Sequence, residues 1–210
     1  MRYRITFSKT DAMRFTGHLD LHTALERTMR RANLPLVYSQ GFTPRPKLSL
    51  ASALPLGYTS EAEMAEFWLK ETLPIEDVAK ALHKATPPGI MVHKVQTVEE
   101  KAPKLQVALS CAHFLISFRE PQPNLVEKVA EMISAKSLPR ERVRKGKKKI
   151  FDLRTLILAA EVLPAEDDNH QQLSLELRAE PGATGRPDDV LKALGIDPLS
   201  PFIHRTKLVF

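Results

Sequence analysis

Cysteine occurs once in these 210 residues, at Cys111, and this scarcity excludes several kinds of site. A single thiol forms no internal disulfide, and it cannot supply the several thiolates of a structural zinc site or an iron–sulfur cluster. Cys111 stands among small and apolar residues in the segment 107–112, so we expect a buried free thiol rather than a nucleophile. A metal site at His18, Asp20 and His22 is an alternative, but the sequence predicts no metal in this chain.

Long hydrophobic runs are absent as well. No segment approaches the roughly 18 uncharged apolar residues that a bilayer-spanning helix needs. Residues 1–7 also lack the apolar stretch of a signal peptide, so we expect a cytoplasmic protein that contacts no membrane. A hydrophobic content of 43% is nevertheless enough for a packed core, and 210 residues can form one large domain or two small ones.

Recognisable catalytic motifs are a third absence. The sequence contains no glycine-rich phosphate-binding loop and no nucleophile elbow. Asp20 has the chemistry of a base or nucleophile, and Ser39 and Ser49 have that of nucleophiles, but a capping or loop position explains each of them. The sequence therefore predicts no catalytic residues in this chain.

What the sequence does contain is positive charge gathered in two segments. The net charge is +6, but residues 1–60 carry nine basic and three acidic side chains, and residues 140–154 carry eight and two. Each segment thus has a net charge of +6, and the rest of the chain has −6. Charge segregated in this way creates a directional field that attracts polyanions, nucleic acid among them.

The pattern of apolar residues predicts an α+β fold. Predicted strands alternate apolar and polar residues, and predicted helices have apolar residues three or four apart. In residues 1–100 the order is strand, helix, two strands, helix, strand, which is the split βαβ or ferredoxin-like arrangement. The order recurs in residues 104–210 after a polar linker at 99–104, so we expect two ferredoxin-like domains in tandem, the second with an inserted basic β-hairpin at 140–151. The predicted strands are 2–7, 47–52, 63–69, 90–98, 114–118, 158–163, 172–179 and 202–209, and the predicted helices are capped by Asp20, begin near Ile75, are capped by Asn124 and begin at Pro187.

Three arginines make the predicted helix after Asp20 a candidate phosphate-binding surface. Arg27, Arg30 and Arg31 are three and four residues apart, so they share the face opposite the apolar stripe. Guanidinium groups on a rigid helix can each donate two hydrogen bonds to one anion. The alternative is a solvated helix face with an ion pair between Glu26 and Arg30.

The segment 38–49 is the second candidate. Its glycine allows an unusual backbone turn, and its two prolines stiffen an extended chain that presents Arg45 and Lys47. Tyr38 and Phe42 place aromatic rings among these charges, a combination that suits single-stranded nucleic acid through stacking and phosphate contacts. A rigid loop whose aromatic side chains fill the domain core is the alternative.

The basic hairpin is the third candidate. Six basic residues lie between positions 142 and 149, and the release of counterions favours phosphate binding by such a cluster. A disordered loop that only aids solubility is the alternative. The candidate RNA-binding residues here are Arg142, Arg144, Lys145, Lys147, Lys148, Lys149 and, beyond the hairpin, Arg154.

Several distinctive segments carry a family resemblance. They are Arg2-Tyr-Arg-Ile-Thr-Phe-Ser-Lys9, Arg14-Phe-Thr-Gly-His-Leu-Asp-Leu21, Glu26-Arg-Thr-Met-Arg-Arg-Ala32, Tyr38-Ser-Gln-Gly-Phe-Thr-Pro-Arg-Pro-Lys47, Leu54-Pro-Leu-Gly57 and Phe151-Asp-Leu-Arg154. Together they resemble the radical-SAM-linked protein family, a bacterial domain of unknown function. The resemblance implies a domain fused to, or encoded beside, a cobalamin-binding radical SAM enzyme, and it supplies no catalytic residues. The iron–sulfur cluster, S-adenosylmethionine and cobalamin would belong to that partner, which agrees with the single cysteine here.

Our leading hypothesis is therefore a non-catalytic accessory module that binds tRNA or rRNA for a partner radical SAM enzyme. One alternative is a protein-docking subunit that contacts this enzyme through residues 14–47, and another is an RNA-modifying enzyme that uses Asp20 or His18. In the first basic segment the candidate RNA-binding residues are Arg14, His18, Arg27, Arg30, Arg31, Tyr38, Phe42, Arg45 and Lys47.

Overall fold

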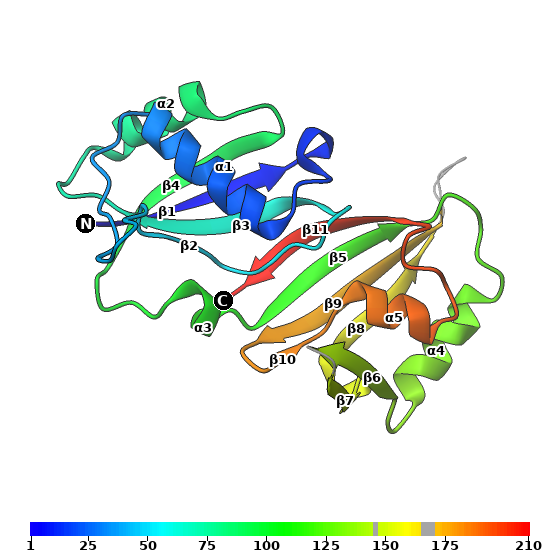
Figure 1. The fold of residues 1–210 in the computed structure, drawn as a ribbon. Helices are drawn as coiled ribbons and strands as arrows, with labels where there is room; N and C mark the ends of the chain where they lie inside the picture. Colours follow the sequence, from blue (N-terminus) through cyan, green and yellow to red (C-terminus); the bar gives the residue numbers. More distant parts are fainter. Residues whose placement is uncertain (145–146, 165–170) are drawn as a thin grey trace. The chain divides into compact units, whose positions relative to one another are not determined.

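The computed structural model describes residues 1–144, 147–164 and 171–210, and Figure 1 shows their course. They divide into two compact units, the first formed by residues 1–109 with Phe210 and the second by residues 110–209. Each unit combines helices with antiparallel strands, so the chain has a mixed α+β fold. Among the helices of the described residues, none is long and apolar enough to cross a membrane.

The first unit contains a four-stranded antiparallel sheet and two longer helices. In this sheet β1 lies between β4 and β3, and β2 pairs with the other edge of β3. A short 3₁₀ turn at Asp11–Met13 follows β1. The elements in chain order are β1 (Arg2–Lys9), α1 (His18–Arg31), β2 (Leu48–Leu50), β3 (Thr59–Trp68), α2 (Ile75–Ala85), β4 (Ile90–Val98) and α3 (Leu105–Ala108).

The core of the first unit lies between one face of this sheet and the helices α1 and α2. Alternation along β1 directs Tyr3, Ile5 and Phe7 to the same face, where all three are buried. On α1 the apolar residues recur at helical spacing, and Leu21 and Leu25 are buried against the same cluster. Full burial of one such side chain stabilises a fold by about 1.5–3 kcal/mol, so this layer holds α1 firmly on the sheet.

The opposite face of β1 carries a buried ion network. Glu66 on β3 accepts hydrogen bonds from Arg2 Nη2 at 2.5 Å and from Arg4 Nη2 at 2.7 Å. Arg2 also donates to the carbonyl oxygens of Ala102 at 2.7 Å and Pro103 at 2.9 Å. These contacts fasten the segment after β4 to the first unit.

The boundary between the two units lies later than the sequence predicts. We expected domains at 1–100 and 104–210, but residues up to Leu109 belong to the first unit. The short helix α3 explains this shift, because Leu105 is fully buried and Gln106 donates to Ser49 Oγ at 2.7 Å. The polar linker is thus part of the first unit, and the second begins at Ser110.

The second unit repeats the same order of strand pairing. Its first strand β5 lies between β11 and β9, and β8 pairs with the other edge of β9. The short strand β10 also pairs with β9, and β6 and β7 form a separate hairpin. The elements are β5 (Cys111–Ser117), α4 (Leu125–Ser134), β6 (Pro139–Arg144), β7 (Lys147–Asp152), β8 (Ile157–Leu163), β9 (Gln172–Glu180), β10 (Ala183–Thr184), α5 (Pro187–Ala193) and β11 (Phe202–Val209), with a 3₁₀ turn at Arg154–Leu156.

Several element limits differ from those predicted. Helix α1 begins at His18, so Asp20 lies in its first turn and is not its N-cap. Gly17 is the N-cap instead, and its carbonyl oxygen accepts the first helical hydrogen bond from Leu21 N at 2.8 Å. The strand expected at 47–52 shrinks to β2, and α3 and β10 were not predicted because elements of two to four residues show no measurable periodicity.

Candidate nucleic-acid interface

A pocket of about 410 Å³ lies between α1 and the loop that follows it. Arg27 and Arg30 line it from the helix, and Arg45 lines it from the loop. This places three guanidinium groups from two separate sequence motifs around one hollow. We call this hollow the arginine pocket, and its remaining lining residues are Thr23, Glu26, Thr43 and Pro44.

Helix geometry explains which of the predicted arginines reach the arginine pocket. Arg27 and Arg30 are exposed and three residues apart, on the side of α1 away from its buried stripe. Arg31 is also exposed, but it turns toward the end of α2, where its Nε and Nη2 donate to the carbonyl oxygen of Ala85 at 3.2 and 2.7 Å. The sequence correctly predicts an arginine-rich helix face. Arg31, however, binds the C-terminal end of α2 and does not line the pocket.

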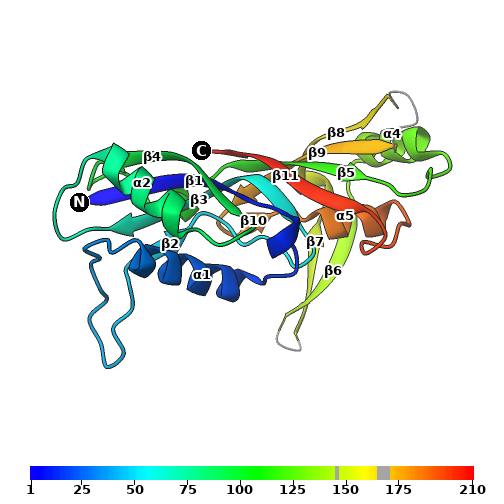
Figure 2. The ribbon, with the colours of Figure 1, turned by 90° about the horizontal axis from the view of Figure 1, so that it is seen from above.

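The loop after α1 is drawn in light blue in Figure 2, where it projects away from the sheet. Hydrogen bonds close this loop at its base. Ser39 N donates to the carbonyl oxygen of Arg45 at 2.8 Å, and Arg45 N donates to Ser39 Oγ at 3.1 Å. Tyr38 and Pro46 form an isolated β-bridge just below. We call residues 38–46 the basic loop.

The aromatic residues of the basic loop are not core residues, so the alternative that they fill the domain core is wrong. Phe42 lies at the tip of the loop with its side chain fully exposed, at 111% of the reference area. Tyr38 is 40% exposed, and the Arg30 guanidinium lies 5.9 Å from the centre of its ring. One ring is thus available to stack, and the other supports an arginine of the pocket.

The arginine pocket also contains one carboxylate. Glu26 is buried, and its Oε1 lies 3.4 Å from Nδ1 of His22 one turn earlier. Glu26 thus contacts His22, and among the described residues the alternative ion pair between Glu26 and Arg30 is not formed. Three guanidinium groups against one carboxylate leave the pocket with positive charge.

The other candidate residues of the first segment lie outside the lining of this pocket. Arg14 donates from Nε to the carbonyl oxygen of Gly57 at 2.8 Å. His18 is the first residue of α1 and is partly buried. Lys47 is exposed, and its Nζ lies 4.4 Å from the centre of the Trp68 ring. These three residues belong to the same unit but do not converge with the pocket arginines.

The predicted basic hairpin is present as β6 and β7, but Arg142 within it and Arg154 just after it are engaged within the chain. Arg142 forms an ion pair with Asp189 on α5, donates to the Thr184 carbonyl oxygen at 3.1 Å, and lies over the Phe151 ring. Arg154 donates from Nε to the carbonyl oxygen of Ile133 at 2.8 Å. Both guanidinium groups therefore already have acceptors in the second unit.

The remaining basic residues of the hairpin are Arg140, Arg144 and its lysines. Lys148 is exposed and lies 3.1 Å from the Glu141 carboxylate. The strands include the backbone of Arg144, Lys147 and Lys149, while Lys145 lies outside the described residues. An exposed ion pair of this kind is weak, so Lys148 can exchange Glu141 for a phosphate at little cost.

Asp152 closes the base of the hairpin. Its Oδ1 accepts hydrogen bonds from the backbone N–H groups of Leu138 at 2.8 Å and Arg154 at 2.9 Å. The hydrogen bond from Leu138 is the main reason that the pKa of Asp152 is lowered. The ionised carboxylate is thus the form that holds the hairpin base together.

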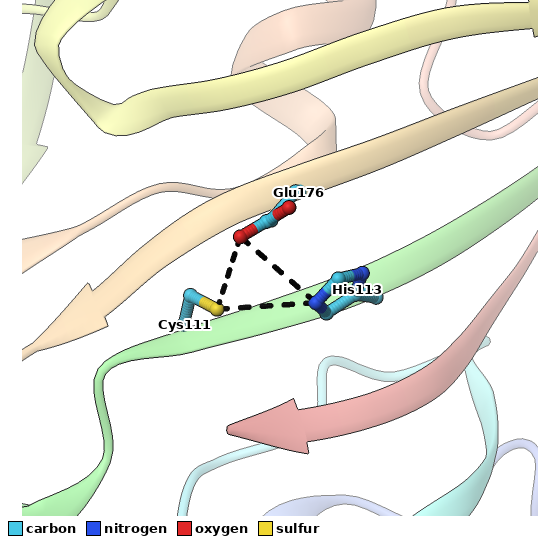
Figure 3. A group of neighbouring side chains, drawn as sticks. All are labelled: Cys111, His113 and Glu176. Carbon is cyan, nitrogen blue, oxygen red and sulfur yellow. Dashed lines mark hydrogen bonds and ion pairs between the residues drawn. The ribbon is translucent and has the colours of Figure 1, made fainter. Parts of the chain in front are cut away.

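A second cluster of functional groups lies on neighbouring strands of the second unit. Cys111 and His113 on β5 and Glu176 on β9 point toward one another in Figure 3. Burial raises the pKa of the Cys111 thiol, and its hydrogen bond to Glu176 adds to this. The buried free thiol is confirmed, but its two neighbours were not predicted. Cys-x-His alternation placed the first two residues on one face, whereas only strand pairing brings Glu176 opposite His113.

Comparison with known proteins identifies the family and a similar fold. The chain resembles one chain of a solved Cbf5–Nop10–Gar1 complex with a TM-score of 0.51 and 10% sequence identity, a likeness of fold alone. The match covers 98% of this chain and 48% of the other, so this chain spans about half its length. A comparison with curated proteins finds no match. Residues 2–187 match a family of uncharacterized proteins conserved in bacteria, and the chain therefore belongs to that family, DUF2344.

Proposed function

We propose that this chain is a non-catalytic accessory module that binds RNA, tRNA or rRNA, for a partner radical SAM enzyme. The partner follows from the resemblance of segments 2–9, 14–21, 26–32 and 38–47 to radical-SAM-linked proteins. In this arrangement the iron–sulfur cluster, S-adenosylmethionine and cobalamin are held by the enzyme. A single cysteine in this chain is compatible with that division of labour.

The observation that carries the proposal is the arginine pocket beside a fully exposed aromatic ring. Arg27, Arg30 and Arg45 present guanidinium groups, which bind phosphate oxygens through paired hydrogen bonds. Phe42 offers a ring on which an unpaired base can stack. Phosphate contacts and base stacking together are the means by which proteins hold single-stranded RNA, so we place a loop or an unpaired end of the RNA here.

We infer further that the two units are ferredoxin-like domains in tandem. In the first unit β1 lies between β4 and β3, and β2 pairs with β3. In the second unit β5 lies in the same way between β11 and β9, and β8 pairs with β9. A helix follows the first strand and another precedes the last. This order of pairing supports a duplicated split βαβ motif with the β6–β7 hairpin inserted in the second copy.

The salt dependence of RNA binding tests the proposal. The variant with Arg27, Arg30 and Arg45 changed to glutamine is compared with wild type by fluorescence anisotropy, using labelled single-stranded RNA and tRNA between 50 and 200 mM salt. A plot of log K against log salt falls with a steepness of about 0.7 for each phosphate contact on single-stranded RNA. Loss of three contacts therefore makes the slope shallower by about 2. The control is Arg31→Gln, which removes one positive charge from α1 outside the pocket. We expect it to leave the slope close to that of wild type.

The hairpin provides a second arm of the same experiment. Changing Lys147, Lys148 and Lys149 to glutamate reverses the charge of β7, and we expect weaker binding to every RNA tested. The proposal is refuted if RNA affinity stays unchanged both in this variant and in the arginine-pocket variant.

A second candidate function, docking to the radical SAM enzyme, is favoured by a separate surface. Phe15, Leu19 and Leu56 are large apolar residues that are at least 62% exposed. Two hydrogen bonds join Arg14, next to Phe15, to Gly57, next to Leu56: Arg14 Nε donates to the Gly57 carbonyl oxygen at 2.8 Å, and Gly57 N donates to the Arg14 carbonyl oxygen at 3.0 Å. Phe15→Ala with Leu19→Ala separates the two functions, because it weakens nuclease-resistant co-purification with the co-expressed enzyme and leaves RNA affinity unchanged.

A further inference from the structure

The cluster on the second unit brings together three different metal-ligating groups. Cys111 Sγ lies 3.4 Å from Glu176 Oε1 and 3.9 Å from His113 Nε2, and the last two atoms are 4.0 Å apart. Strand geometry fixes this arrangement. Residues 111 and 113 lie on one face of β5, and Glu176 is the direct partner of His113 on β9.

These distances are close to those around a tetrahedral ion. Zinc bonds of about 2.3 Å to sulfur and about 2.0–2.2 Å to nitrogen or oxygen place neighbouring ligand atoms about 3.4–3.6 Å apart. The sulfur–oxygen distance already falls at this value, and the two distances to His113 exceed it by about 0.6 Å at most. His113 and Glu176 keep 31% and 34% of their side-chain surface exposed, so a small rotation of either can close the gap.

The ligand types indicate which ions fit. A thiolate excludes the hard ions Mg²⁺ and Ca²⁺ and favours zinc and its analogues, while imidazole and carboxylate are both common zinc ligands. Three protein ligands leave a fourth tetrahedral position for water, as in reactive rather than purely structural zinc sites. The buried sulfur lies on the protein side, and the exposed edges of His113 and Glu176 give an ion its path from solvent.

We propose that Cys111, His113 and Glu176 form a binding site for a zinc-class divalent ion in the second unit, with a solvent molecule as its fourth ligand. The thiol loses its proton to solvent when the ion binds. The positive charge of Lys207, which pairs with His113 from β11, opposes the ion and limits its affinity. This site is independent of the proposed RNA surface, so either can fail without the other.

Cobalt spectroscopy tests the site directly. The full chain is freed of metal with a chelator and titrated with Co²⁺ under reducing conditions. We expect one equivalent to bind, with a near-ultraviolet thiolate-to-cobalt absorption band and visible bands of a tetrahedral ion, and with displacement of both by Zn²⁺. Cys111→Ser abolishes the near-ultraviolet band, and His113→Ala and Glu176→Gln each weaken the affinity by at least about tenfold.

Matched controls and a folding check make the result decisive. His83 on α2 and Glu161 on β8 are exposed, so His83→Ala and Glu161→Gln leave cobalt affinity unchanged. Lys207→Gln tightens it. Circular dichroism checks that each variant is folded. If Cys111→Ser does not fold, the conservative variant Glu176→Gln still tests the site through its cobalt affinity. Absence of the thiolate band in the wild-type protein, or unchanged cobalt affinity in folded His113→Ala and Glu176→Gln, overturns the proposal and leaves a hydrogen-bonded cluster.

Discussion

Phe42→Ala alters a side chain that is fully exposed at the tip of the basic loop, so its effects on folding and on binding separate cleanly. The ring buries no surface in the free protein, and its removal leaves no cavity. A surface substitution of this kind changes the free energy of unfolding by less than about 0.5 kcal/mol. The base of the loop also stays closed, because its hydrogen bonds join the backbones of Ser39 and Arg45.

Binding of single-stranded RNA responds quite differently. Loss of a stacked base costs about 1–3 kcal/mol, which corresponds to an increase of Kd by about 5-fold to about 140-fold. The ring carries no charge, so the slope of log K against log salt remains that of the wild type. Phe42→Trp restores binding because its ring also stacks, whereas Phe42→Leu does not.

Fluorescence anisotropy at several salt concentrations and urea unfolding measure the two effects on the same samples. The pattern expected is weaker binding, an unchanged slope and unchanged stability, whereas the arginine-pocket variant combines weaker binding with a changed slope. Equal affinity of Phe42→Ala and wild type for an unstructured RNA would refute the assignment of this ring to base stacking. A matching loss for Phe42→Ala and Phe42→Trp would refute it as well.

Three further predictions concern the fold. Glu66→Ala leaves the buried Arg2 guanidinium and the partly buried Arg4 guanidinium without their carboxylate, so urea unfolding should show a loss of about 3–5 kcal/mol, and a loss below about 1 kcal/mol contradicts the buried network. Asp152 has a lowered pKa, so its contribution to the free energy of unfolding is complete above the ordinary pKa of 3.8 and is lost as pH falls through the lowered pKa. An NMR titration that follows the Leu138 amide should give a midpoint below 3.8, and a midpoint above 3.8 is the contrary result. Leu175→Ala empties a fully buried position on β9 and should cost about 2–5 kcal/mol, with near-wild-type stability as the contrary outcome.

The regular elements follow closely from local patterns in the sequence. The predicted strands at 90–98 and 202–209 have the limits of β4 and β11, because Gly89 and Pro201 stand directly before them and mark where each strand begins. The start of α1 was misplaced by three residues, since a side-chain cap at Asp20 was expected where the backbone of Gly17 suffices. Short elements without a full period escape any such analysis.

The side-chain roles were harder to predict because they depend on partners far away in the sequence. Arg31 and Arg142 have the same local signature as the pocket arginines, yet Ala85 and Asp189 provide their acceptors. Only the packing of α1 beside α2 and of the hairpin beside α5 reveals this. The same is true of Glu176, which is absent from any local motif around Cys111.

The closed base of the basic loop has a consequence for how this surface can vary. Because hydrogen bonds between residues 37–39 and 45–47 fix both ends, the tip at residues 40–44 can change in sequence without disturbing α1 or the sheet. A tip taken from another member of the family could thus be exchanged as a unit. Under the proposed RNA-binding function, such chimaeras would transfer ligand preference between otherwise unchanged scaffolds, which makes this loop the natural starting point for redesign.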